Sequence, residues 1–187
     1  MVFSHAFVGA AVAHVVAGKK KFTKKQRVGL WVVAITASVF PDFDLSIILL
    51  NPALSHRELI SHSIFPYMLI FGLGWLIADA LDWRFLKSLN LAFFLGVLSH
   101  VFLDLVIGGV VLLAPLTWEM YGYEIKGCIG QKYWIIDYLK SWYLAVELLP
   151  IAFYFWIRKY WKVGIYHALP WGLFVVSIFM IIVFTNL

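Results

Sequence analysis

Six long runs of apolar residues follow one another along the chain, separated by short polar stretches. In order, they cover Val2–Ala17, Val28–Leu50, Ile64–Leu81, Leu89–Leu113, Trp142–Trp156 and Ile165–Leu187. Crossing the hydrocarbon core of a bilayer takes about 20 helical residues, and the second, fourth and sixth runs reach that length easily. The other three are short enough to tilt or to cross only in part. Because only helices satisfy their own backbones in lipid at these lengths, the pattern predicts an all-α, polytopic membrane helix bundle of about six helices.

The composition agrees with a membrane protein of one domain. Of the 187 residues, 63% are hydrophobic and only 13% are charged, which is more apolar surface than one soluble domain can bury. We expect a single integral membrane domain over 1–187, with a motif-bearing core (1–115), an aromatic interfacial loop (115–141) and two C-terminal helices (142–187). The chain starts without the basic segment and cleavage site of a signal peptide, so we expect the first helix to be retained. The single cysteine, Cys128, excludes an intramolecular disulfide framework.

The basic residues predict how the chain lies in the membrane. Eleven of the 15 Lys and Arg residues follow the odd-numbered apolar runs, and six of them fall between Lys19 and Arg27. Cytoplasmic loops carry an excess of Lys and Arg, so we expect both termini and the even-numbered turns to lie outside the cytoplasm. Membrane orientation thus explains the net charge of +5, and no nucleic-acid partner is expected because no nucleic-acid motif accompanies it.

Ionisable side chains interrupt the apolar runs at positions that this topology brings to the outer leaflet. His100 and Asp104 are four residues apart, which places them on one helix face about 6 Å apart along the axis. Asp42 and Asp44 follow Pro41, which should loosen the helix and let alternate residues project together. Buried imidazoles and carboxylates need partners, and a divalent metal suits both. The candidate metal ligands are His5, Asp42, Asp44, His56, His62, His100 and Asp104.

Other polar residues near these ligands suggest a reaction. Arg57, beside His56, presents a planar guanidinium that suits bidentate binding of a phosphate or carboxylate. Asp44 and Glu58 are candidate general bases, and serines such as Ser61 can orient the histidine ligands. We therefore place Arg57, Glu58 and Asp44 in catalytic roles. His14 and His167 lie toward the cytoplasmic side and are expected to be structural, whereas Glu147 stays an open question.

Each motif also has an explanation without metal. His100 and Asp104 could form a hydrogen-bonded pair that joins helices or orients other ligands. The carboxylates after Pro41 could mark a helix end that reaches water, and Arg57 could be an interfacial arginine that extends to the headgroups. His5 alone is typical of a solvated terminus, although Gly9, four residues on, permits close helix approach on the same face.

The order of these motifs resembles the YdjM-like family of membrane-bound, metal-dependent hydrolases. The resemblance covers residues 4–115, and the aromatic tail from Trp118 onward lies outside it. Its motifs are His5 with Gly9, Pro41-Asp42-Phe43-Asp44, His56-Arg57, Ser61-His62-Ser63, Ser99-His100 with Asp104, and Gly109-Val110-Val111-Leu112-Leu113-Ala114-Pro115. One departure is Ser61, where Thr is common before the second histidine. The resemblance implies metal-dependent hydrolysis, without identifying a substrate.

Three functions are compatible with the sequence. The first is a hydrolase in the cell membrane whose divalent metal, Zn or else Mn or Mg, activates water against a phosphoester or related ester of a lipid-like or phosphorylated substrate. The second is a proton- or metal-coupled transporter, since intramembrane Asp and His also build relays. The third is an interaction protein with a structural metal. The sequence leaves open the number of ions and the oligomeric state.

Overall fold

A computed structural model describes residues 4–18, 20–50, 56–122 and 142–158 of the chain. The helices are α1 (Ser4–Ala17), α2 (Lys24–Val39), α3 (Leu45–Leu50), α4 (Phe65–Ala80), α5 (Arg84–Ile107) and α7 (Trp142–Arg158). Within these ranges no strand occurs, and one isolated bridge joins Val110 to Tyr121. The predicted all-α class is confirmed. The sixth apolar run and most of the aromatic loop lie outside the described residues.

The second apolar run is divided at a proline. Thr23 caps α2 through a capping box with Gln26, so the helix has a defined start. The helix ends at Val39, and the next five residues form a short 3-10 helix, η1 (Phe40–Asp44), with Pro41 near its start. Proline removes a backbone donor and clashes with the preceding turn. The helix is therefore interrupted, as predicted from Pro41, and the two carboxylates that follow leave the line of α2.

The fourth apolar run differs from its predicted bounds. The helix α5 begins at Arg84 and ends at Ile107, whereas the pattern predicted Leu89–Leu113. Gly108 and Gly109 follow it, and Gly109 has a φ of +71°, a conformation that glycine adopts without steric cost. Residues 108–113 thus leave the helix, although they are as apolar as a helical run. Val110 pairs with Tyr121, while the Val111 N–H donates to the Arg57 carbonyl oxygen and the Leu112 carbonyl oxygen accepts from the Ile64 N–H.

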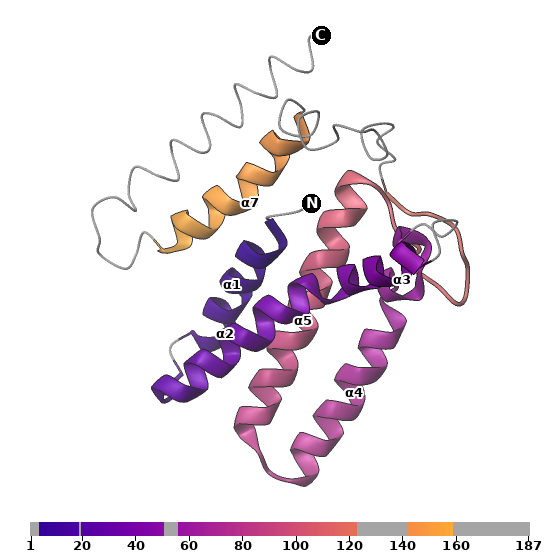
Figure 1. Ribbon diagram of the computed structural model, residues 1–187. Coiled ribbons are helices and arrows are strands. Elements are labelled where there is room, and N and C mark those ends of the chain that lie inside the picture. The colour runs from indigo at the N-terminus through magenta and orange to yellow at the C-terminus, as the bar shows by residue number, and fades with distance from the viewer. Residues whose placement is uncertain (1–3, 19, 51–55, 123–141, 159–187) are drawn as a thin grey trace.

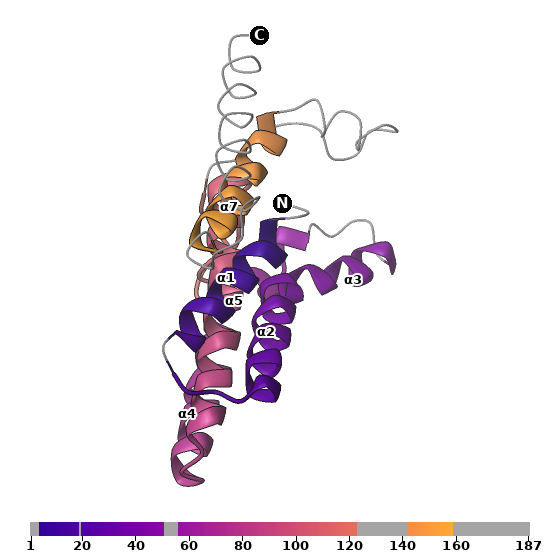
Figure 2. The same cartoon turned by 90° about the vertical axis from the view of Figure 1, so that its left-hand side faces the viewer.

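Helices α1, α2 and α5 contact one another, while α4 packs on α5 and α7 packs on α1 (Figures 1 and 2). The contact among the first, second and fourth runs was predicted. Small residues allow it: a Cβ on Gly9 would lie 2.2 Å from the Ser38 hydroxyl oxygen, and one on Gly96 would lie 2.8 Å from the Ala34 carbonyl oxygen. Close backbone approach of this kind replaces large apolar side chains in membrane bundles.

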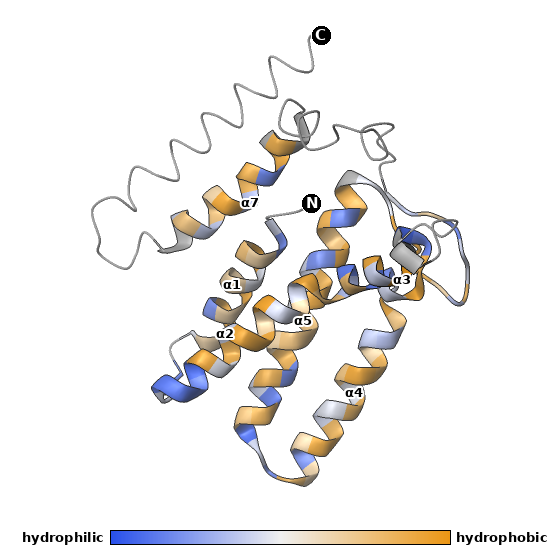
Figure 3. Ribbon diagram, in the orientation of Figure 1, coloured by the Kyte–Doolittle hydropathy of each residue, from blue (hydrophilic) through white to orange (hydrophobic). Residues whose placement is uncertain are grey.

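In the part of the chain that the structure describes, two stretches are long and apolar enough to cross a membrane, Lys24–Ile47 and Arg84–Val106. Hydrophilic positions gather where α2 begins, at the turn between α4 and α5 and, at the other end of the bundle, around α3 and on the last turns of α5 (Figure 3). The start of α1, the end of α2 and the last turns of α5 meet at that second end (Figure 1). The packing of the helices therefore brings the polar motifs to one end of the bundle.

Candidate metal centre

Among the residues that the structure describes, four side chains with metal-ligand atoms converge at this end of the bundle. They are Asp42 on η1, His62 on the short 3-10 helix η3 (Ile60–His62), and His100 and Asp104 on α5. One ligand atom from each lies within 4.8 Å of all the others. His62, His100 and Asp104 are buried, whereas the Asp42 side chain keeps 27% of its surface exposed. The cluster is thus buried except at Asp42, and the space between its four ligand atoms is called the pocket below.

A backbone carbonyl group at the end of α2 orients the His100 ring. Its Nδ1 lies 2.8 Å from the carbonyl oxygen of Ser38 at the end of α2, so this nitrogen donates its proton there. Its Nε2 lies 3.4 Å from Asp104 Oδ2 and 3.5 Å from Asp42 Oδ1. Metal-binding histidines commonly donate the second ring nitrogen to an oxygen in this way. The geometry leaves the Nε2 lone pair of His100 facing the pocket.

His62 repeats the arrangement from the other side. Its Nδ1 lies 3.2 Å from Asp44 Oδ2, and the Ser61 hydroxyl donates a hydrogen bond to the same carboxylate oxygen. Its Nε2 lies 3.5 Å from Asp104 Oδ2 and 3.4 Å from the Nε2 of His100. Burial lowers the pKa of His62, but the Asp104 and Asp42 carboxylates oppose it and raise the pKa to about 9. Without a metal, a proton on His62 therefore takes the place of a cation.

This donor set fits a divalent cation. When both histidines give their Nδ1 protons to oxygen atoms, two imidazole lone pairs and two carboxylates face one another in a buried pocket. Groups of that kind repel each other unless a cation lies between them. Nitrogen and carboxylate ligands suit Zn²⁺, and Mn²⁺ is compatible with the same set. The described residues can therefore hold a metal ion, although the donor set does not select one metal.

Asp104 also contacts two residues outside this group of four. Its Oδ1 lies 3.6 Å from His5 Nε2 and 3.6 Å from an Arg57 guanidinium nitrogen. The His5 ring is buried and stacks on His100 with 3.9 Å between ring centroids, and neither of its nitrogens makes a hydrogen bond within the described residues. Asp104 thus presents one oxygen to the two histidines of the pocket and the other to His5 and Arg57.

The remaining candidates occupy different places. Asp44 faces the outer nitrogen of His62 and is not one of the four converging residues. Glu58 is exposed, and no described contact joins it to the pocket. The side chain of His56 lies outside the described residues. Ser38 was not foreseen from the sequence. The sequence indicated this role of Ser38 only indirectly. A helix that ends before Pro41 has backbone carbonyl groups in its last turn that need hydrogen-bond donors from elsewhere.

The comparison with protein families identifies the family of the chain. A sequence profile of the YdjM inner membrane protein family matches residues 1–186. The chain belongs to this family. The resemblance carried by the motifs in residues 4–115 is thus confirmed, and the match continues through the aromatic tail from Trp118 onward. No curated protein and no solved structure matches the chain. As a YdjM family protein with apolar helices, the chain is a membrane protein that carries a His/Asp group able to hold a metal ion.

Proposed function

We propose that this YdjM family protein is a metal-dependent hydrolase that cleaves a phosphoester or related ester in a lipid-like substrate. The observation that carries the proposal is the pocket itself. Two imidazole nitrogens and two carboxylates converge within 4.8 Å, and both imidazoles are oriented by oxygen atoms behind them. Because both Nδ1 atoms face oxygen atoms, the two Nε2 atoms and the two carboxylates need positive charge among them, and a divalent ion would supply more of it than the single proton on His62.

Three buried side chains would hold the ion: His62, His100 and Asp104. Catalytic zinc sites commonly use three protein ligands and keep one position open. A divalent ion there lowers the pKa of a water molecule toward about 7 and polarises the ester under attack. The Ser38 carbonyl and the Asp44 carboxylate keep the two imidazoles turned toward the ion, which limits the reorganisation that the reaction requires.

Asp42 is the group best placed to accept a proton. It lies on the exposed side of the pocket, with Oδ1 3.5 Å from His100 Nε2 and 3.9 Å from His62 Nε2. A water molecule that enters from this side meets Asp42 first, and Oδ1 would take its proton as the water attacks. Asp44 acts behind His62 and contacts no reacting atom. Glu58, which is exposed, has no part in this mechanism.

Arg57 would bind the anionic group of the substrate. Its guanidinium packs directly against Gly108, so a side chain at position 108 would have to displace it. The Nε of Arg57 is buried without a hydrogen-bond partner among the described residues, while a terminal nitrogen stays 3.6 Å from Asp104 Oδ1. A fixed guanidinium with donors to spare beside a metal pocket suits a phosphate.

The surroundings of the pocket suit a lipid. Phe40, Phe43 and Leu45 flank Asp42 along η1 and α3, with exposed fractions of 44%, 58% and 46%. An acyl or polyprenyl chain can lie over these residues while its phosphate reaches Arg57. The proposal places the pocket on the extracytoplasmic side. The basic α1–α2 hairpin at the other end of α2 supports this orientation, because Lys and Arg are enriched on the cytoplasmic side.

Hydrolysis assays on detergent-solubilised protein test the proposal. Phospholipids and polyprenyl phosphates serve as anionic substrates, and an uncharged long-chain ester serves as the neutral one. We expect His100→Ala to abolish activity, while His14→Ala, a matched change away from the pocket, should leave it unchanged. Asp42→Asn should retain metal but lose at least a hundredfold in kcat. An active His100→Ala protein would refute the mechanism.

Arg57→Ala and Arg57→Lys separate anion binding from structure. Removing hydrogen bonds to a charged group costs about 1.5–3 kcal/mol, so we expect KM for the anionic substrates to rise roughly ten- to a hundredfold. The neutral ester should be cleaved as before, and lysine should restore only part of the loss because it lacks the guanidinium fork. Equal losses on both substrates would assign Arg57 a structural role.

A further inference from the structure

A second candidate binding site lies at the far end of α2, away from the metal pocket. A groove of about 850 Å³ runs between the end of α1 and one face of α2. Lys24 and Arg27 line its basic end. The apolar floor is formed by Val28, Trp31, Val32 and Ile35, and the lining is completed by His14, Ala17 and Thr36. The two valines are 54% and 58% exposed. The groove therefore combines a cationic end with an apolar floor.

The charge around this groove has one sign. The first 41 residues contain neither Asp nor Glu, and the α1–α2 hairpin carries Lys19, Lys20, Lys21, Lys24, Lys25 and Arg27. None of the ion pairs among the described residues involves this hairpin. One Arg27 nitrogen donates to the Lys20 carbonyl oxygen at 3.3 Å, which holds the guanidinium near the chain turn. An anion at this end would meet no opposing carboxylate from α1 or α2.

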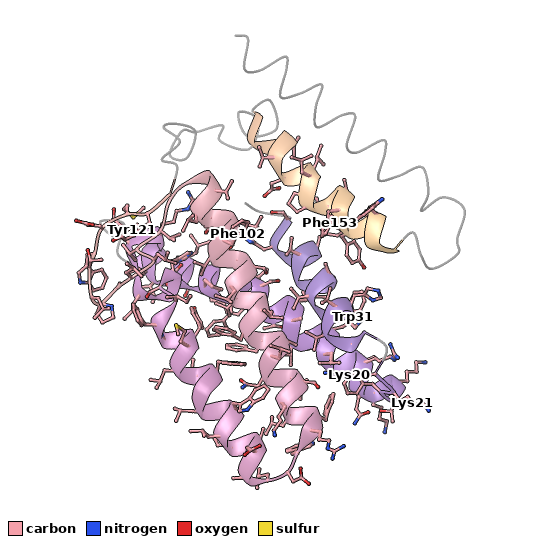
Figure 4. All side chains as sticks on the ribbon, turned by 180° about the vertical axis from the view of Figure 1, so that it is seen from behind. Lys20, Lys21, Trp31, Phe102, Tyr121 and Phe153 are labelled. Carbon is pink, nitrogen blue, oxygen red and sulfur yellow. The ribbon has the colours of Figure 1, made fainter. Side chains whose placement is uncertain are left out.

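The length of the groove matches one leaflet of a bilayer. Twelve residues separate Lys24 from Thr36 at the other end of the lining, which is about 18 Å of helix. Half of the hydrocarbon core is about 15 Å thick. A headgroup at Lys24 and Arg27 would thus let an acyl chain follow Val28 and Val32 toward the bilayer centre. Figure 4 shows Lys20 and Lys21 at the hairpin, with Trp31 further along.

We propose that this groove binds one anionic phospholipid, with its phosphate between Lys24 and Arg27 and an acyl chain along Val28 and Val32. Basic pockets between helices on the cytoplasmic side are the usual form of such sites. The inference does not depend on the metal pocket, because it uses neither its residues nor its end of the bundle.

Native mass spectrometry of the full-length protein in detergent tests the site, with phosphatidylglycerol and phosphatidylcholine as probes. We expect one phosphatidylglycerol to bind at least tenfold more tightly than phosphatidylcholine. Lys24→Gln with Arg27→Gln should weaken it roughly thirtyfold, from about 1 kcal/mol for each basic group near the surface. The matched control is Lys21→Gln with Lys25→Gln, which removes the same charge from the same hairpin but not from the groove lining. This control pair should weaken phosphatidylglycerol binding less than threefold.

A third variant keeps the charges and fills the groove. Val32→Trp places a larger apolar side chain at an exposed position, so folding is unaffected and lipid binding should fall at least tenfold. Thermal unfolding of each variant in the same detergent checks that it is folded, whether or not the protein binds a metal. Equal losses in the two glutamine pairs, or unchanged binding in Val32→Trp, would overturn the proposal. So would equal binding of the two lipids, or no bound lipid in the wild type because another segment of the chain fills the groove.

Discussion

Asp44 offers a graded test of how the candidate metal centre is built. Its carboxylate lies 3.2 Å from Nδ1 of His62 and accepts a hydrogen bond from the Ser61 hydroxyl, while Nε2 of His62 faces the pocket. The Asp44 side chain is only 5% exposed, so solvent screens this contact little. Asp44→Asn removes the charge at nearly constant volume and lets the amide present either a donor or an acceptor to the ring.

The expected magnitudes follow from these contacts. Losing a group that orients a metal-binding histidine typically lowers metal affinity 10- to 100-fold, which is about 1.4–2.8 kcal/mol. Asp44→Asn should fall in this range with the metal stoichiometry unchanged. Ser61→Ala removes one hydrogen bond to the carboxylate, worth about 1 kcal/mol, and should cost about fivefold. His62→Ala removes a ligand and should abolish stoichiometric binding.

Competition between the metal-stripped protein and a chromogenic zinc chelator gives these affinities. Asp79→Asn is the matched control, because Asp79 is exposed and pairs with Lys87 at the α4–α5 hairpin. The zinc affinity of this variant should stay within twofold of the wild-type value. An Asp44→Asn protein with unchanged affinity would refute the orienting role. A variant that binds no metal would instead make Asp44 a direct ligand, as the sequence alone allowed.

Two further predictions concern protons and packing. Since the pKa of His62 is raised to about 9 without metal, its proton stabilises the metal-free fold fully below pH 6.5 and that stabilisation is lost as pH rises through 9. Metal must displace this proton, so chelator competition at pH 7, 8 and 9 should show affinity rising with pH, by up to about tenfold per unit; a flat profile would contradict it. Gly9→Ala should destabilise the protein by about 1–3 kcal/mol through overpacking against Ser38. Gly72→Ala, with nothing within 4 Å of the added Cβ, should instead be neutral or stabilising by up to about 1 kcal/mol; equal shifts in thermal unfolding would refute the packing argument.

Local sequence rules predicted the parts of the site that local structure sets. The spacing of His100 and Asp104 places both side chains on one face of any helix, and Pro41 indicated where α2 would be interrupted. Gly9 indicated a close helix contact, which the structure places against Ser38. These inferences needed only the period of a helix and the backbone chemistry of proline and glycine.

Contacts between distant segments could not be read in the same way. Arg57 packs against Gly108, 51 positions further along the chain, and no periodic pattern links the two. The end of α5 was also missed. Residues 108–113 are apolar enough to extend a helix, but Val110 pairs with Tyr121 and Val111 donates to the Arg57 carbonyl oxygen instead. Asp42 and Asp44 look equivalent in sequence, and only the fold turns one toward the pocket and the other behind His62.

Metal analysis of the purified full-length protein tests the central claim most directly. After stripping and reconstitution with Zn²⁺ or Mn²⁺ and removal of the excess, we expect about one ion per chain in the wild type and in His14→Ala. His100→Ala and Asp104→Ala should each retain less than a tenth of that amount, because each removes a buried ligand from the pocket. The assignment would be contradicted by a wild-type protein that binds no metal. It would also be contradicted if a protein with both His100→Ala and Asp104→Ala still bound one ion.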